Sequence, residues 1–323
     1  MVDVRQGDHQ TVQEAGRRLR QGGLVVIPTE TVYGLAACTM RGEAVSEIFT
    51  LKGRPGDNPL IAHVLDVPMA RTITASWPPQ AAALAEAFWP GPLTMVLPRN
   101  PAVPAVATAG LDTIAVRSPR HPIAQAILQA AGQPLSAPSA NRSGCVSPTR
   151  AAHVQDDYAG VAAAERLLVV DGGPCEEGLE STVVDLSGDV ARVLRCGTVG
   201  RDAIKAVIGS LSPTPPPQSQ DASPGTRHRH YAPRKDMVCC QRAAVASVLA
   251  SGDPASVIAL ADVPVPPPHT HLALPDNPPD AGAALYDLLR QADAASTSRV
   301  VAVIPDRDGW AVIQDRLRRG AAG

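Results

Sequence analysis

The stretch Lys52-Gly53-Arg54-Pro55-Gly56-Asp57-Asn58-Pro59-Leu60 leads directly into an apolar run at residues 60–65. Glycine and proline interrupt both helices and strands, so the quoted stretch is predicted to be a loop. The apolar run has the length of a buried strand. Lys52 and Arg54 would then lie at the entrance of an inner strand, where phosphate groups are commonly held. By itself such a loop is more often a solvated surface turn, so the neighbouring segments must decide between the two interpretations.

An earlier strand ends in a second polar segment. Residues 24–27, Leu-Val-Val-Ile, are mostly β-branched and stop at Pro28, which predicts an inner strand. The hydroxyl-rich segment Pro28-Thr29-Glu30-Thr31-Val32-Tyr33-Gly34-Leu35 follows at its carboxyl end, where α/β proteins commonly bind ligands. The helix before this strand is expected to begin with a capping box at residues 11–14 and to end at Gly22-Gly23.

Helices and strands alternate over the first 210 residues, which predicts an α/β domain with a mixed sheet. Further strands are expected at 93–97, 112–117, 166–170, 181–185 and 190–195, and helices at 44–51, 80–89, 122–131 and 198–208. The last two strands are expected to form a hairpin around Ser187-Gly188-Asp189.

The composition changes near Ser210, which suggests three regions. Residues 1–210 form the first domain. Residues 211–235 form a Pro-rich linker that ends in the cationic segment 223–234. Residues 236–323 return to alternating patterns and predict a small Rossmann-like α/β domain, with strands at 257–260, 271–274 and 300–304 and helices at 242–250, 281–292 and 309–319.

Charge and cysteine content exclude several classes of protein. The formal net charge of −2 gives no general attraction for nucleic acid, so any RNA contact would need a local cationic patch. The six cysteines form no C-x-x-C pair, which argues against a structural zinc site and favours reduced thiols. No apolar run reaches the ~20 residues of a membrane span, and the polar start resembles no signal peptide, so a soluble cytoplasmic protein without membrane attachment is expected.

Cationic side chains recur near the ends of the expected strands: Lys52, Arg54, His63, Arg117, Arg142 and Arg195. If they converge, they would suit a polyanion such as a nucleoside triphosphate with Mg²⁺. The chain contains neither a P-loop motif nor the dinucleotide-binding glycine motif. No metal-ligand cluster or covalent nucleophile is apparent, so no metal-binding residues are predicted.

Several ordered motifs together resemble the YrdC-type threonylcarbamoyl-AMP synthases. They are the segment 28–35, the pair Lys52-Gly53-Arg54, Asn58-Pro59-Leu60, the pair Ser139-Ala140-Asn141, and the segment 223–233. The K-x-R and S-x-N pairs are the signature of that family, and the last segment with its trailing domain resembles the long form. The resemblance covers about residues 10–235 and implies a YrdC-like twisted mixed sheet with flanking helices and a concave cationic face.

The resemblance also implies residue roles. The threonine-binding set is Thr31, His63, Arg117, Ala137 and Ser181. The ATP-binding set is Arg54, Asn58, Thr113, Ser139, Ser147, Arg195 and Tyr231. Lys52 and Arg54 are the expected catalytic residues, with Lys52 near the phosphates or the carboxylated amine.

The implied activity is a nucleotidyl transfer in which L-threonine, bicarbonate and Mg²⁺-ATP give threonylcarbamoyl-AMP and pyrophosphate. A partner transferase would pass the threonylcarbamoyl group to an adenosine of certain tRNAs, and the enzyme itself could contact tRNA. Residues 212–233 are hypothesised to cover the site, with Tyr231 on the nucleotide.

Two other functions remain open. Similar domains are implied to bind double-stranded RNA without catalysis, or to transfer carbamoyl groups in hydrogenase maturation. The acidic net charge and the scarcity of aromatic residues, 3% of the chain, argue against the first. The absence of acylphosphatase-like and cysteine-rich zinc modules argues against the second.

Overall fold

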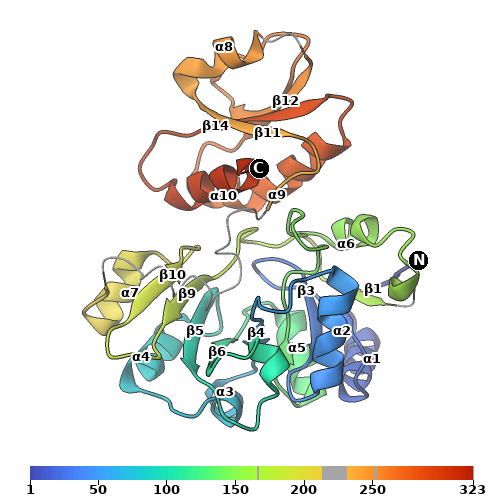
Figure 1. Cartoon of the computed structure of the whole chain (residues 1–323), viewed down its shortest axis with the longest axis vertical. Coiled ribbons are helices and arrows are strands. Elements are labelled where there is room, and N and C mark those ends of the chain that lie inside the picture. Colours follow the sequence, from blue (N-terminus) through green and yellow to red (C-terminus); the bar gives the residue numbers. More distant parts are fainter. Residues whose placement is uncertain (166, 213–230, 251–252, 323) are drawn as a thin grey trace. The chain divides into compact units, whose positions relative to one another are not determined.

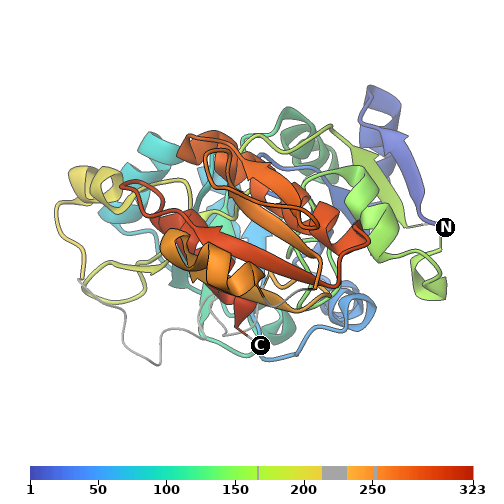
Figure 2. The ribbon, with the colours of Figure 1, turned by 90° about the horizontal axis from the view of Figure 1, so that it is seen from above.

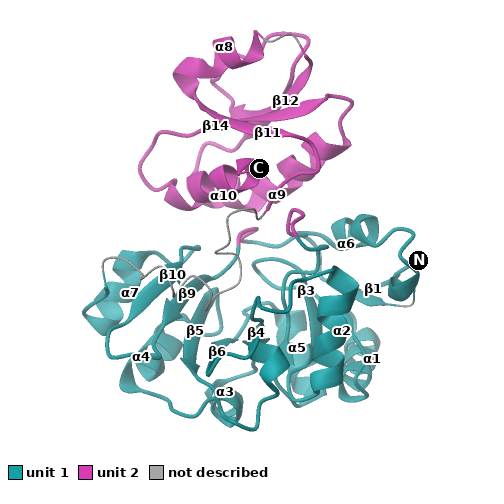
Figure 3. Ribbon diagram, viewed as in Figure 1, with its two compact units in different colours: residues 1–143, 148–176, 180–227 teal, residues 144–147, 177–179, 228–323 magenta. Residues whose placement is uncertain are grey.

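The computed structural model describes residues 1–165, 167–212, 231–250 and 253–322, and these divide into two units (Figure 3). Unit 1 comprises residues 1–143, 148–176 and 180–227, and unit 2 comprises 144–147, 177–179 and 228–323. The short segments 144–147 and 177–179 therefore group with the carboxyl-terminal part of the chain, although unit 1 flanks both of them in sequence.

Unit 1 is built around one mixed sheet. Its described strands are β1 (Asp3–Gln6), β2 (Val25–Ile27), β3 (Gly34–Cys38), β4 (Ile61–His63), β5 (Leu93–Pro98), β6 (Thr113–Arg117), β7 (Leu135–Ser136), β8 (Leu168–Asp171), β9 (Thr182–Asp185) and β10 (Arg192–Arg195). Its described helices are α1 (His9–Arg20), α2 (Gly42–Lys52), α3 (Val67–Ile73), α4 (Pro79–Phe88), α5 (Pro122–Ala131), α6 (Ala151–Asp157) and α7 (Arg201–Ile208), with short 3₁₀ turns at Ala105–Thr108 and Ala162–Ala164.

The strand order is β1-β8-β2-β3-β7-β4-β6-β5-β9-β10 (Figure 1). Parallel pairs join β4 to β6 and β5 to β9, whereas β5 and β6 are antiparallel. The carboxyl ends of β4 and β6 therefore lie at the same edge as the amino ends of β5 and β9. The expected hairpin of β9 and β10 is confirmed.

Side-chain alternation divides the core of this sheet into two layers. Val25 and Ile27 of β2 pack with the buried residues of α1 and α5, which cover one face. Val26, between them in sequence, belongs to the opposite layer, which includes the buried residues of α2, α3 and α4. Strand β2 is therefore apolar on both sides, which explains its continuous apolar run in the sequence.

Unit 2 has a wholly parallel sheet of order β11-β14-β12-β13 among its described strands (Figure 1, Figure 2). The strands are β11 (Met237–Gln241), β12 (Ala255–Leu260), β13 (Thr270–Leu274) and β14 (Arg299–Ile304). The helices are α8 (Val245–Leu249), α9 (Pro278–Ala294) and α10 (Ala311–Ala321), with a 3₁₀ turn at Arg242–Ala244 before α8. The small Rossmann-like α/β domain predicted from the sequence is confirmed.

Tyr231 packs inside unit 2. Its ring stacks on that of Tyr286 in α9, with centroids 5.5 Å apart, and the guanidinium of Arg316 in α10 lies 5.1 Å from its centroid. Tyr231 is fully buried and has a positive φ of 65°. A non-glycine residue in this conformation needs strong packing to hold it.

Three local predictions are wrong. Helix α1 begins earlier than expected, because Asp8 rather than Thr11 is its N-cap and accepts from the Thr11 N–H at 2.8 Å. Lys52 belongs to the last turn of α2 rather than to a loop, and Gly53, with a φ of 61°, ends that helix. Strand β1 forms from the polar residues at the start of the chain, where the sequence predicts no strand, and it pairs with β8.

Removing the Tyr231 ring should destabilise unit 2. Tyr231→Ala is expected to lower its unfolding free energy by about 3–5 kcal/mol, because a large buried ring is lost. Tyr231→Phe keeps the ring and should stay within about 1.5 kcal/mol of wild type. Native-state hydrogen exchange of β14 measures both effects, and equal protection in the wild type and the alanine variant would contradict the packing role.

Candidate active site

One face of β4, β6, β5 and β9 carries a small apolar cluster of Ile61, Val96, Ala115 and Val183. Their sequence neighbours, such as Ala62 and Val116, point to the opposite layer. Because side chains along a strand alternate, residues two positions from the cluster members share their face.

Six polar residues meet this condition: His63, Thr94, Thr113, Arg117, Ser181 and Asp185. Four of them are among the residues predicted from the resemblance, and Thr94 and Asp185 are additions. His63 and Arg117 are register partners at the carboxyl ends of β4 and β6. Thr113 begins β6, so it lies four residues and about 13 Å from Arg117 along the strand.

The Arg117 side chain is the centre of a buried polar group. Its Nη2 lies 2.7 Å from Oε1 of Glu30, its Nη1 donates to Oγ1 of Thr31 at 2.8 Å, and its Nε donates to the Gly91 carbonyl at 3.3 Å. Arg117 and Glu30 are 3% and 1% exposed, so neither charge is balanced by bulk water. The guanidinium has five N–H donors, which leaves some for a further acceptor.

Thr29 fixes the segment that carries Glu30 and Thr31. Its Oγ1 donates to the Val32 carbonyl at 2.6 Å, accepts from the Thr31 and Val32 backbone N–H groups, and lies 2.9 Å from Oγ1 of Thr31. This is a side-chain turn of the type that hydroxyl residues favour. It explains the dense hydroxyl pattern after β2.

Burial and the guanidinium together set the protonation of this group. Burial opposes the charged form of Glu30, but the Arg117 guanidinium outweighs that effect and holds the pKa of Glu30 below its ordinary value. Burial, assisted by the positive charge of Arg117, lowers the pKa of His63 to about 3. His63 is therefore neutral at physiological pH, and among the described residues its Nδ1 has no hydrogen-bond partner.

Ser181 and Arg195 contact each other directly. The Nη2 and Nε atoms of Arg195 donate to Oγ and to the carbonyl oxygen of Ser181, at 3.2 and 3.1 Å. The Ser181 hydroxyl also lies 2.7 Å from Oγ1 of Thr94. A residue predicted for threonine and one predicted for ATP are thus neighbours.

Lys52 joins the two signature motifs. It is 2% exposed, and its Nζ donates to the carbonyl oxygens of Ser139, at 2.6 Å, and of Asn141. The Ser143 N–H in turn donates to the Lys52 carbonyl at 2.9 Å. The ammonium group therefore orients the segment 139–143, a role that the sequence did not reveal.

Arg54 organises the loop before β4. Its Nε and Nη2 donate to the carbonyl oxygens of Asn58 and Pro59, at 3.1 and 3.0 Å. Asn58 is buried, 7% exposed. Ala137 follows β7, and its N–H donates to the carbonyl of Ile61 at 2.9 Å, so this predicted threonine contact also borders β4.

Ser147 and Tyr231 belong to unit 2 and not to unit 1. Both are fully buried, and the Val146 carbonyl beside Ser147 accepts from Nη2 of Arg290 in α9. Their predicted contact with ATP stays a prediction. The proposed cover, residues 212–233, lies mostly outside the described residues.

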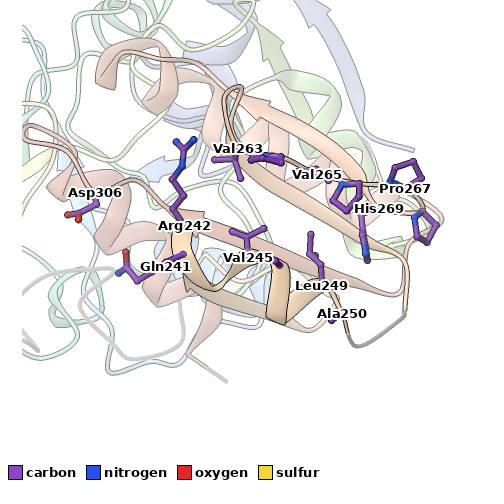
Figure 4. A pocket seen from close by; sticks show the side chains of 15 residues that line it. Gln241, Arg242, Val245, Leu249, Ala250, Val263, Val265, Pro267, His269 and Asp306 are labelled. Carbon is purple, nitrogen blue, oxygen red and sulfur yellow. The ribbon is translucent and has the colours of Figure 1, made fainter.

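Unit 2 also contains a pocket of about 1660 Å³ beside α8 (Figure 4). Its lining is mainly apolar, including Val245, Leu249, Val263 and Val265, with Arg242 and Asp306 at the margin. None of the predicted substrate residues lines it. Pocket size alone therefore does not identify the candidate site.

Two kinds of feature are absent from the described ranges. They contain no group of three or more His, Cys, Asp or Glu side chains arranged to hold a metal ion. No helix in these ranges has both the length and the apolar character needed to cross a membrane.

The sequence missed four residues that build this site: Thr29, Glu30, Thr94 and Asn141. Thr29, Glu30 and Asn141 lie inside the quoted motifs, so their position was visible although their contacts were not. Thr94 follows the turn Trp89-Pro90-Gly91-Pro92 and carries no local signal, because its partner Ser181 is 87 residues away in the chain.

Two family models match the chain. The model Sua5_yciO_yrdC, described as "Telomere recombination", matches residues 17–197. A second, described as "Threonylcarbamoyl-AMP synthase, C-terminal domain", matches residues 199–322.

Curated relatives agree with these models. The chain is 42% identical over 234 residues to threonylcarbamoyl-AMP synthase of Bacillus subtilis, covering 71% of this chain and 66% of the relative. It is 43% identical over 224 residues to the protein of that name from Pyrococcus abyssi, covering 68% and 65%. The matched segments thus span just under two thirds of the length of these relatives.

Solved structures give the same fold. The crystal structure of P. abyssi Sua5 complexed with L-threonine superposes with a TM-score of 0.88 at 33% identity, covering 99% of this chain and 97% of that one. Escherichia coli YciO, at 24% identity, matches with a TM-score of 0.54 over 63% of this chain and 98% of its own, which supports the fold alone. The predicted YrdC-like fold class is confirmed.

The chain belongs to the Sua5/YciO/YrdC family. Within it, the second model places the chain with the two-domain members, whose carboxyl-terminal domain is described from threonylcarbamoyl-AMP synthases.

Gly197 should be intolerant of a side chain. A Cβ at this position would lie 2.4 Å from the Glu180 carbonyl oxygen and 2.5 Å from the Thr182 nitrogen, which are backbone atoms on either side of Ser181. Gly197→Ala is expected to cost about 1–3 kcal/mol of unfolding free energy. Gly188→Ala, with nothing within 4 Å, should change it by less than about 0.5 kcal/mol. Denaturant unfolding distinguishes the two, and equal stability would contradict the close approach.

Acid should weaken the fold through His63. Its pKa is about 3 when folded and about 6.5 when unfolded, so between these values the unfolded chain binds the extra proton. The stabilisation is complete above about pH 6.5 and is lost as the pH falls toward 3. Unfolding free energies between pH 7 and 5 should fall less steeply in His63→Gln than in wild type. The same change at the exposed His9 should keep the wild-type slope, and identical slopes in all three proteins would contradict the prediction.

Proposed function

We propose that this protein is an L-threonylcarbamoyladenylate synthase. The threonine amine and bicarbonate form a carbamate with loss of water. A carbamate oxygen then attacks the α-phosphorus of ATP and displaces pyrophosphate, which leaves threonylcarbamoyl-AMP. The reaction is a nucleotidyl transfer that requires orientation and charge balance rather than a covalent nucleophile.

The observation that carries this proposal is the shared face of His63, Thr94, Arg117 and Ser181 in a chain 33% identical to a Sua5 crystallised with L-threonine. Relatives named threonylcarbamoyl-AMP synthase support the same activity. These names and the site together favour synthesis over simple RNA binding or carbamoyl transfer.

Threonine is proposed to bind at the carboxyl ends of β4 and β6. Arg117 would donate to the carboxylate, and its pairing with Glu30 and Thr31 holds the guanidinium in place. His63, being neutral, would offer a hydrogen bond without adding charge. Ala137 and Ser181 would complete the proposed contacts.

ATP is proposed to contact a second set of residues. The proposed set is Arg54, Asn58, Thr113, Ser139, Ser147, Arg195 and Tyr231. Arg54 is oriented by its hydrogen bonds to two carbonyl oxygens, and an oriented guanidinium suits phosphate. Mg²⁺ would arrive on the ATP phosphates, keeping phosphate and water oxygens as ligands, because it loses water reluctantly.

A second enzyme must use threonylcarbamoyl-AMP soon after it forms, because acyl adenylates hydrolyse readily. A transferase acting on a tRNA adenosine is the proposed partner, in the cytoplasm. Direct contact of this chain with tRNA is part of the same proposal.

Pyrophosphate release with Mg²⁺-ATP, L-threonine and bicarbonate tests the activity. Omitting any one of the three should abolish it, and release that persists without threonine or bicarbonate would overturn the proposal.

Arg54→Ala should reduce the rate by about 10²–10³-fold, because a positioned cation at the phosphates is removed. Arg71→Ala, on the exposed side of α3, is the matched control. Lys52→Ala is less informative, since Lys52 also holds the segment 139–143.

A further inference from the structure

The buried hydroxyl pair Thr94–Ser181 lies beside the proposed threonine site. The two oxygens are 2.7 Å apart, and both residues are at most 1% exposed. Thr94 adjoins Met95, whose register partner is Val116, so continuing the antiparallel register by one step brings Thr94 level with Arg117. The pair thus stands at the same strand level as the guanidinium.

The hydrogen-bonding capacity of Ser181 is limited. A serine hydroxyl has one proton to donate and two lone pairs to accept with. Nη2 of Arg195 donates to Oγ and occupies one lone pair. Thr94 can either donate to the second lone pair or accept the single proton, because either oxygen can be the donor.

These two states have different consequences for a ligand. If Ser181 donates to Thr94, its proton is used within the protein. If Thr94 donates to Ser181, both lone pairs of Ser181 are filled and its proton can only point to a third acceptor. Accepting a bond from a cationic N–H also polarises the Ser181 hydroxyl and strengthens it as a donor.

We propose that Thr94 is a positioning residue, which donates to Ser181 when substrate is bound and so directs the Ser181 proton to an acceptor oxygen of threonine. This inference rests on the proposed function. The exchange of donor roles requires only rotation of two hydroxyl groups. Serine at position 94 could perform it, whereas valine, of nearly the same shape, could not.

A purely structural role for the pair is the alternative. Unit 2 contains a comparable pair, Ser256 and Thr297, with oxygens 2.7 Å apart and both side chains buried. That pair joins two parts of unit 2, and none of its residues belongs to a predicted substrate set. It offers a matched control for loss of a buried hydroxyl bond.

The test measures L-threonine affinity of the full chain by calorimetry and KM for threonine in pyrophosphate release. Thr94→Val should weaken both by about three- to tenfold, the range for one hydrogen bond. Thr94→Ser should restore them to within about twofold of wild type. Thr297→Val should leave both unchanged. If the valine variant does not fold, Thr94→Ala is measured in its place, with the same expected result.

A double-mutant cycle shows whether Thr94 acts through Ser181. Ser181→Ala should weaken threonine binding, and adding Thr94→Val should then have no further effect. Additive losses, or wild-type affinity in Thr94→Val, would overturn this inference and leave the proposed function intact. A wild-type chain that binds no threonine would overturn both, whereas binding without threonine-dependent pyrophosphate release would overturn the proposed function alone.

Discussion

The buried ion pair of Glu30 and Arg117 is the constraint on which the site depends. The two charges come from separate elements, the turn after β2 and the last residue of β6, and they meet 2.7 Å apart with almost no exposure. Removing one partner of such a pair typically costs about 3–5 kcal/mol, because the other charge is left buried. The pair therefore fixes where the polar segment after β2 lies against the carboxyl end of β6. Neighbouring His63 stays neutral mainly because it is buried; the charge of Arg117 assists this effect and that of Glu30 opposes it.

A second constraint ties the family signature together. Lys52 ends α2, and its ammonium group reaches the carbonyl oxygens of Ser139 and Asn141, almost ninety residues later in the chain. Backbone carbonyls that are buried need donors, and an ammonium group with three N–H bonds can serve two of them at once. The K-x-R and S-x-N pairs are thus linked by direct hydrogen bonds. Lys52 holds the segment 139–143, and Arg54 holds the residues just before β4.

The sequence predicted much of this fold, because apolar runs bounded by glycine and proline mark inner strands such as β2, β5 and β14 directly. It missed β3 and β11, and also β7, which has two residues, and β1, whose exposed polar side chains leave no apolar pattern. Most site residues were predicted from the motif resemblance. Their side-chain contacts were not predicted, because Thr94 and Ser181, like Glu30 and Arg117, are about 87 residues apart in the chain and meet only in the folded sheet.

The partners of the cations divide the site electrostatically. The charge of Arg117 is balanced by the carboxylate of Glu30, and the neutral His63 adds no charge. An amino acid that is a zwitterion has no net charge, and a balanced pocket can bind it through directed hydrogen bonds. Arg54, Lys52 and Arg195 donate to carbonyl or hydroxyl oxygens, and these bonds orient the cationic groups. Positive charge held in fixed positions is what a triphosphate requires. On the proposed function, the paired Arg117 and Glu30 would suit the zwitterionic threonine, and the oriented cations Arg54 and Arg195 would suit the triphosphate.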